Sequence, residues 1–149
     1  MEKFIEKIVK SAKIKIKNTE YIVKTKTWYS IEEDENTSYI KCELSNNKVL
    51  VIIPDDNLIS IGEIIENMNY QRISDEIIKY NDVIFNKTSS GHQYITKIEF
   101  GLEDEVEGRC IFEDYEAENN IISLGILPDK SNERADVFAE TLKLEDIEI

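Results

Sequence analysis

The chain is poor in the residues that build metal sites, disulfide frameworks and phosphate-binding loops. Its 149 residues include two cysteines, Cys42 and Cys110, and one histidine, His92. A structural zinc site takes four Cys or His ligands, and this chain offers three, so the sequence predicts no metal. None of the five glycines falls in a G-x-G-x-x-G or G-x-x-x-x-G-K-[ST] pattern. We therefore expect no cofactor.

Long apolar runs are also absent. No stretch reaches the roughly eighteen consecutive apolar residues of a membrane-spanning helix. The first 13 residues interleave lysine and glutamate with Phe4, Ile5, Ile8 and Val9, so they lack the apolar core of an export signal. We expect a cytoplasmic protein with reduced thiols and no membrane insertion.

Negative charge dominates the chain. Eighteen Lys and Arg residues stand against 31 Asp and Glu residues, which gives a net charge of −13. This argues against a nucleic-acid partner, because such binders gain much of their affinity from neutralising phosphates. Residues 1–27 instead carry a net positive charge, with eight lysines against three glutamates. Residues 13–17 alternate lysine with isoleucine. This pattern indicates either a solvent-facing strand surface or sheet edge, or a docking stripe for an acidic partner or for the acidic part of the same chain.

The hydrophobic pattern predicts a mainly β fold, an antiparallel meander that forms a barrel or a sandwich. The spacing of residues 4–9 predicts a short N-terminal helix, and residues 58–80 predict one or two short helices in the middle. Asn46-Asn47 predicts a hairpin turn, Pro54 the end of a strand, and Ser89-Ser90-Gly91 another turn. The expected strands are 14–17, 21–31, 38–44, 48–53, 83–85, 94–100, 108–114, 121–127 and 142–149.

The length predicts a single domain, residues 1–149. Within it, the order of elements repeats. Cys42 and Cys110 are each followed by a strand, an Asn-Asn turn, a second strand and a Pro-Asp pair. This order predicts two related β-hairpin halves, residues 14–60 and 81–149.

Several short motifs of the chain form a recognisable set: Tyr21-Ile22-Val23, Trp28-Tyr29, Tyr39-x-x-x-x-Leu44, Glu107-Gly108-Arg109-Cys110, Asp114-Tyr115 and Gly125. In these motifs the chain resembles a bacterial and archaeal family known as domain of unknown function 4178. The resemblance implies a β-rich intracellular prokaryotic module with no assigned activity, and it supplies no functional residue. The chain departs from the family at residues 125–128, Gly-Ile-Leu-Pro, where the family pattern has a glutamate.

The sequence offers no recognisable catalytic centre. Ser89, Ser90 and His92 are near neighbours on a predicted turn, where a nucleophile and a base rarely reach the geometry they need, so we expect an exposed turn histidine. The acidic clusters at 103–107 and 113–118 lack the spacing of a calcium-binding loop. We interpret them as solvated surface and predict neither a catalytic nor a metal-binding residue.

The aromatic residues Trp28, Tyr29, Tyr39 and Tyr115 are the candidate binding residues, with a role as core fillers as the alternative. These features favour a noncatalytic cytosolic protein-interaction or scaffolding module with a protein partner. One alternative is an acidic immunity or inhibitor protein that blocks a basic toxin. The other is a small enzyme with carboxylate chemistry, for which Glu43, Asp114 and Tyr115 are the candidates. Oligomeric state is left open.

Overall fold

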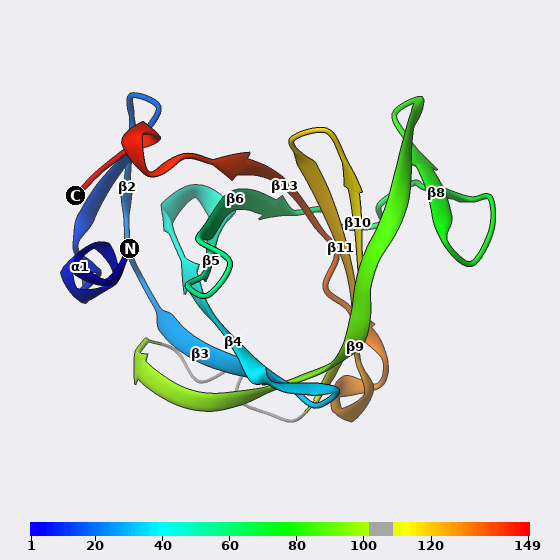
Figure 1. Cartoon of the computed structure of the whole chain (residues 1–149), viewed down its shortest axis with the longest axis horizontal. Helices are drawn as coiled ribbons and strands as arrows, with labels where there is room; N and C mark the ends of the chain where they lie inside the picture. Colours follow the sequence, from blue (N-terminus) through cyan, green and yellow to red (C-terminus); the bar gives the residue numbers. More distant parts are fainter. Residues whose placement is uncertain (102–108) are drawn as a thin grey trace.

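The computed structural model describes residues 1–101 and 109–149, and in it eight antiparallel strands close into a barrel (Figure 1). Around the ring they are β3 (Lys26–Ile31), β4 (Asp34–Glu43), β5 (Lys48–Ile53), β6 (Leu58–Ile64), β13 (Val137–Leu142), β11 (Asn120–Leu127), β10 (Cys110–Ala117) and β9 (Val83–Phe100). The long strand β9 pairs with both β10 and β3, and this double pairing closes the ring.

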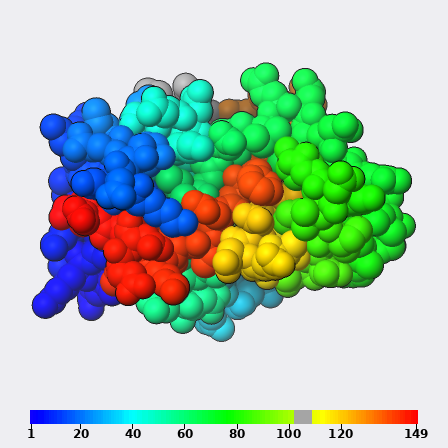
Figure 2. Space-filling view, turned by 90° about the horizontal axis from the view of Figure 1, so that it is seen from above, coloured from blue at the N-terminus to red at the C-terminus, as the bar shows by residue number. Residues whose placement is uncertain are grey.

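Two small units lie outside the ring on opposite sides (Figure 1). One comprises α1 (Glu2–Lys7) and the sheet of β14 (Ile147–Glu148), β1 (Lys13–Ile16) and β2 (Thr19–Ile22). The other is the hairpin of β7 (Gln71–Arg72) and β8 (Ile77–Tyr80), which extends the sheet at β9. The short strand β12 (Glu133–Arg134) pairs with β11. Figure 2 shows the first strands, in blue, against the C-terminal segment, in red.

The apolar clusters lie on the outer surface of the barrel wall. One cluster joins wall residues such as Ile40 and Leu50 to Phe4 of α1 and Ile14 of β1. The other joins β10 and β11 to the β7–β8 hairpin; its buried residues are Met68, Ile78, Phe85, Tyr115, Ile122 and Leu124. Burying one such aliphatic or aromatic side chain contributes about 1.5 to 3 kcal/mol. Apolar burial therefore fixes both outer units to the wall.

Because side chains alternate along a strand, the neighbours of these outward residues face the barrel axis. Lys41 follows the outward Ile40, and Asp114 precedes the outward Tyr115. Ser123 is the register partner of Asp114 across β10 and β11. Part of the inner face of the wall is therefore polar.

The mainly β prediction, the antiparallel barrel and the N-terminal helix are confirmed. The Asn46-Asn47 turn is also present: both residues have positive φ, 62° and 59°, in the short turn η1 (Ser45–Asn47). The strand predicted over 48–53 coincides with β5. The predicted halves 14–60 and 81–149 stay a prediction.

The prediction of helices in the middle of the chain is wrong. Residues 58–80 form β6, β7 and β8, and the described residues beyond α1 hold only the 3-10 turns η1, η2 (Pro128–Lys130) and η3 (Leu144–Asp146). In β6, Ile59 and Ile61 pack in the outer cluster, while Ser60 alternates with them. A Cβ on Gly62 would lie 2.7 Å from the carbonyl oxygen of Phe138. The spacing of the apolar residues in this region fits both a helix and a strand, and the close packing against β13 selects the strand.

The turn predicted at Ser89-Ser90-Gly91 is wrong as well, because β9 runs through these residues without a break. Gly91 serves close packing instead: a Cβ there would collide with the carboxylate of Glu33. The predicted acidic cluster at 103–107 lies outside the described residues. No described helix has the length and apolar character needed to cross a membrane.

Candidate functional site

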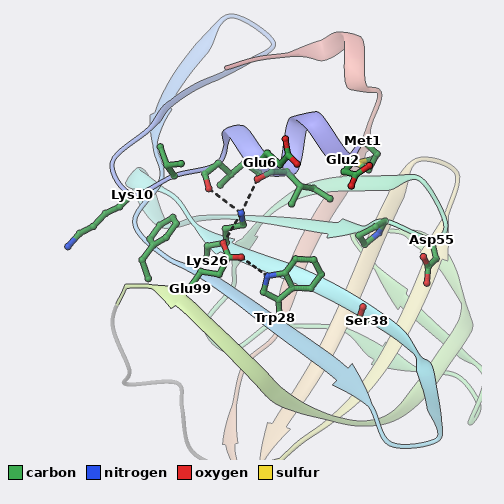
Figure 3. A pocket seen from close by; sticks show the side chains of 14 residues that line it. Met1, Glu2, Glu6, Lys10, Lys26, Trp28, Ser38, Asp55 and Glu99 are labelled. Atoms are coloured by element: carbon green, nitrogen blue, oxygen red, sulfur yellow. Dashed lines mark hydrogen bonds and ion pairs between the residues drawn. The ribbon is translucent and has the colours of Figure 1, made fainter.

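A groove of about 870 Å³ lies between α1 and the barrel wall (Figure 3). Ile5 and Val9 line it on the N-terminal side, and Trp28 of β3, Pro54 and Phe100 of β9 line it elsewhere. Val9 is 55% exposed. Clefts that bind small ligands measure roughly 300 to 1,000 Å³, so the groove is large enough to accept several side chains of a bound segment.

Lys26 holds α1 in place along this groove. Its side chain is 5% exposed, and its Nζ donates to the carbonyl oxygens of Ile5 at 2.9 Å and Ile8 at 3.2 Å. The last carbonyls of a helix have no partner within the helix, so the ammonium group satisfies them. The same Nζ lies 2.8 Å from Oε2 of Glu99. Lys26 therefore joins the end of α1 to β9.

Glu99 also orients the tryptophan. The indole Nε1 of Trp28 donates to Oε1 of Glu99 at 3.2 Å. Burial disfavours the ionised carboxyl, but the hydrogen bonds from Lys26 and Trp28 outweigh it, and the pKa of Glu99 is lowered. The predicted binding residue Trp28, the single tryptophan of the chain, thus has a fixed position in the groove.

The rim of the groove is acidic. Glu2 and Glu6 of α1 and Asp55, which follows β5, line it, and all three are exposed; Glu2 and Asp55 lie toward the same end (Figure 3). Figure 3 shows Lys10 at the opposite end with its side chain directed outward. Lys26, the other lysine of the lining, is buried against Glu99. The accessible rim therefore presents more negative than positive charge.

The predicted binding residues Tyr29 and Tyr39 come together on the inner face of the wall. Their rings stack at 5.0 Å between centroids with 6° between planes. The hydroxyl of Tyr39 donates to Oε1 of Gln93 in a short hydrogen bond. Tyr29 follows Trp28 on β3, so the two side chains point to opposite faces of the wall. The structure therefore does not unite these aromatic residues in one surface.

Asp114 and Cys110 also face the barrel axis. Burial raises the pKa of Asp114 to about 6, against a hydrogen bond from Ser123 that lowers it. Burial likewise raises the pKa of the Cys110 thiol, while the nearby charge of Lys41 lowers it. The thiol is therefore a poor nucleophile at neutral pH.

The three residues considered for carboxylate chemistry do not assemble. Tyr115 faces outward and is fully buried, and its hydroxyl accepts from Nη1 of Arg72 at 3.0 Å and donates to Oε2 of Glu113 at 3.2 Å. Asp114, its neighbour, faces the axis. Glu43 lies on β4. Because Tyr115 and Asp114 point to opposite faces of the wall, the three side chains do not meet at one site in the described structure.

A further polar cluster lies where the β3–β4 hairpin meets β9. The backbone N–H of Glu32 donates to the carbonyl oxygen of His92 at 2.8 Å, and the N–H of His92 donates to Oε2 of Glu33 at 2.8 Å. Nδ1 of His92 makes a short contact with Oε1 of Glu33 and lies 3.9 Å from Oε2 of Glu32. Hydrogen bonds from the His92 side chain and backbone lower the pKa of Glu33 to about 2. Arg109 pairs closely with Glu32.

The expectation of a turn histidine is therefore wrong: His92 lies within β9, and its partly exposed side chain has an acidic partner. Sequence reasoning missed this cluster because 59 residues separate Glu33 from His92. The pairing of β3 with β9 brings them together, and no local pattern reports that pairing.

Comparisons of the chain with protein-family models, with curated proteins and with solved structures found no match. The resemblance to domain of unknown function 4178 therefore stays a prediction.

Proposed function

We propose that the protein is a noncatalytic protein-interaction module, and that the groove beside α1 binds a cationic, amphipathic segment of a partner protein. The observation that carries this proposal is the combination of apolar lining and acidic rim in one groove. Trp28 and Phe100 offer apolar surface, and Glu2, Glu6 and Asp55 offer negative charge beside it. Tryptophan is among the residues that most often dominate binding energy at interfaces.

Charge supports the same kind of partner over longer distances. The net charge of −13 attracts basic proteins and repels acidic ones. Complementary charge speeds association and favours the right partner more than it adds affinity. The apolar lining then supplies the short-range contacts. A segment with lysine or arginine on one side and leucine-like residues on the other satisfies both requirements.

The groove is organised before any partner arrives. Glu99 accepts from both Lys26 and Trp28, so the same carboxylate positions the helix end and the indole ring. A preorganised surface loses less conformational entropy when it binds. This arrangement favours a binding role, because Lys26 and Glu99 are engaged with each other, with the end of the helix and with the indole ring.

The two alternatives differ in their support. An immunity or inhibitor protein against a basic toxin is a special case of the proposed module, and inhibition of such a toxin would identify it. The carboxylate enzyme has less support, because Glu43, Asp114 and Tyr115 do not converge.

A titration with two matched synthetic peptides tests the proposal. The first peptide is amphipathic with lysine on its polar side, and the second replaces each lysine with glutamate. We expect calorimetry to show saturable binding of the first peptide only, weakening with added salt because exposed charges are screened. Neutralising the rim in the triple variant Glu2→Gln, Glu6→Gln, Asp55→Asn should weaken binding about tenfold, which is 1.4 kcal/mol.

The control is a variant with the same net charge, Asp82→Asn, Glu118→Gln, Glu145→Gln, which neutralises exposed carboxylates elsewhere. It should retain nearly all of the affinity. Equal loss in both triple variants would show a general charge effect and contradict binding in the groove. Equal binding of the acidic peptide would contradict the proposed partner chemistry.

A further inference from the structure

The cluster between the β3–β4 hairpin and β9 gathers three potential metal ligands. Oxygen atoms of Glu32 and Glu33 and a ring nitrogen of His92 all lie within 4.8 Å of one another. Glu32 and Glu33 connect β3 to β4, and His92 lies on β9 beside Gly91. The cluster is therefore a mixed nitrogen and oxygen donor set assembled from two distant parts of the chain, and it is distinct from a patch of surface carboxylates.

Hydrogen bonds with β9 hold the carboxylate of Glu33 and the backbone of Glu32 in fixed positions. The N–H of His92 donates to Oε2 of Glu33, and the missing Cβ of Gly91 leaves the space that this carboxylate occupies. The N–H of Glu32 donates to the carbonyl oxygen of His92, which ties the hairpin to β9. Only small movements of the side chains are then needed to surround an ion.

The distances suit a small divalent ion. Zinc binds imidazole nitrogen and carboxylate oxygen at about 2.0 to 2.2 Å, so ligands of one tetrahedral ion lie roughly 3.3 Å apart. Nδ1 of His92 lies 3.9 Å from Oε2 of Glu32 and closer than that to Oε1 of Glu33. A small decrease in the first distance and a small increase in the second would bring both to the tetrahedral value, and the oxygen atoms of Glu32 and Glu33 already lie within 4.8 Å of each other.

We propose that Glu32, Glu33 and His92 bind a divalent transition-metal ion of the zinc class, with Nδ1 of His92 as the nitrogen ligand. Imidazole with carboxylate favours zinc and its neighbours over magnesium or calcium, which prefer all-oxygen sites. Three protein ligands leave a fourth position for water or for a group from a partner.

Arg109 has a defined part in this proposal. Its guanidinium group pairs with the carboxylate of Glu32 and competes with the ion for that ligand. Removing the arginine charge should therefore strengthen metal binding, whereas removing a ligand should weaken it. This opposite pair of effects distinguishes a specific site from general attraction of cations to an acidic protein.

The inference stands apart from the proposed groove. Glu32 lies four residues beyond Trp28 along β3, roughly 13 Å at the usual rise of a strand. Metal binding and peptide binding can therefore be tested independently, and a different measurement reports each.

The test titrates the purified chain with Zn²⁺ in a non-chelating buffer and measures binding by calorimetry. His92 is the only histidine, so the nitrogen resonances of one imidazole ring report its ligation by NMR without ambiguity. We expect one-to-one binding with a large shift at Nδ1. His92→Gln and Glu33→Gln should each weaken binding at least about tenfold, and Arg109→Gln should tighten it.

The charge control is the double variant Asp82→Asn, Glu145→Gln, which should bind Zn²⁺ like the original chain. Far-ultraviolet circular dichroism checks that every variant keeps its β structure; His92 is half-buried, and glutamine preserves most of its size. If Zn²⁺ does not bind, or binds without moving the His92 resonances, the proposal is wrong. Equal weakening by the control variant would also overturn it, since an adventitious acidic patch would then explain the binding.

Discussion

The buried ammonium group of Lys26 lies 2.8 Å from a carboxylate oxygen of Glu99, in the barrel wall beneath α1. The other oxygen of that carboxylate accepts from the indole of Trp28. One ion pair thus connects the N-terminal helix, the long strand β9 and the aromatic residue of the groove. The shape of the proposed binding surface depends on this pair.

Replacing Lys26 should destabilise the protein strongly. The variant Lys26→Met leaves Glu99 with only the more exposed Lys97 as a cation and removes the ammonium donor from the carbonyls of Ile5 and Ile8, and breaking such a buried pair costs about 3 kcal/mol. Urea unfolding measures the change. Lys24→Met, at an exposed position two residues earlier, is the control and should change the free energy of unfolding by less than about 0.5 kcal/mol. Equal losses in the two variants would contradict the role assigned to Lys26.

Asp114 should make stability depend on pH in an unusual direction. Its pKa rises from 3.8 to about 6 on folding, so protonation favours the folded state. This contribution is fully present below pH 3.8 and is lost as the pH rises through about 6.

The variant Asp114→Asn removes this dependence. It should be more stable than the original chain by about 2 kcal/mol near pH 7.5, with the difference shrinking toward zero near pH 4. Urea unfolding at the two pH values measures the difference. A variant that is less stable at both pH values would show that the carboxylate forms a favourable ionic contact.

Gly62 should tolerate no side chain. An added Cβ would lie 2.7 Å from the carbonyl oxygen of Phe138 and 2.8 Å from the Cβ of Ala139. Because the nearest atom belongs to the backbone, this steric clash can be relieved only if β6 and β13 move apart. We expect Gly62→Ala to lower the free energy of unfolding by about 2 kcal/mol, measured by urea unfolding. An unchanged midpoint would show that the two strands lie farther apart than described.

The hydroxyl of Tyr115 should matter for the β7–β8 hairpin. Arg72 on β7 donates to it, and Glu113 accepts from it, so the hydroxyl links the hairpin to β10. Tyr115→Phe keeps the buried ring and removes the hydroxyl. We expect a loss of about 1 kcal/mol in stability, with faster hydrogen exchange concentrated in β7 and β8. Uniformly faster exchange across the barrel would contradict a local role.

Much of the fold was predictable where short-range patterns act alone. The Asn46-Asn47 turn and strand β5 follow from the tolerance of asparagine for positive φ and from a run of β-branched residues. The region after residue 58 was ambiguous, because the spacing of Ile59 and Ile61 fits a strand, whereas a helical face is suited by Ile61, Ile64, Ile65 and Met68. Contact with β13 settles the matter, and that contact is not local.

The candidate sites were predictable only in part. Trp28 was identified as a binding residue, but its separation from Tyr29 and Tyr39 depends on which face of the wall each side chain takes. Both faces of β3 are covered, one by α1 and one by the barrel, so the alternation between polar and apolar residues is weak. The position of Lys26, which is 4% exposed, could not be predicted from its neighbours in the sequence. Its burial depends on α1 and Glu99, which lie far away in sequence.

The indole N–H resonance of Trp28 gives the most direct test of the proposed groove. The chain has one tryptophan, so a single signal reports this position in a nitrogen-proton NMR spectrum. We expect the lysine-containing amphipathic peptide to shift this signal progressively to saturation, and the glutamate-containing peptide to leave it in place. A Trp28 signal that stays fixed while other resonances saturate with the basic peptide would place binding elsewhere and contradict a binding site in the groove.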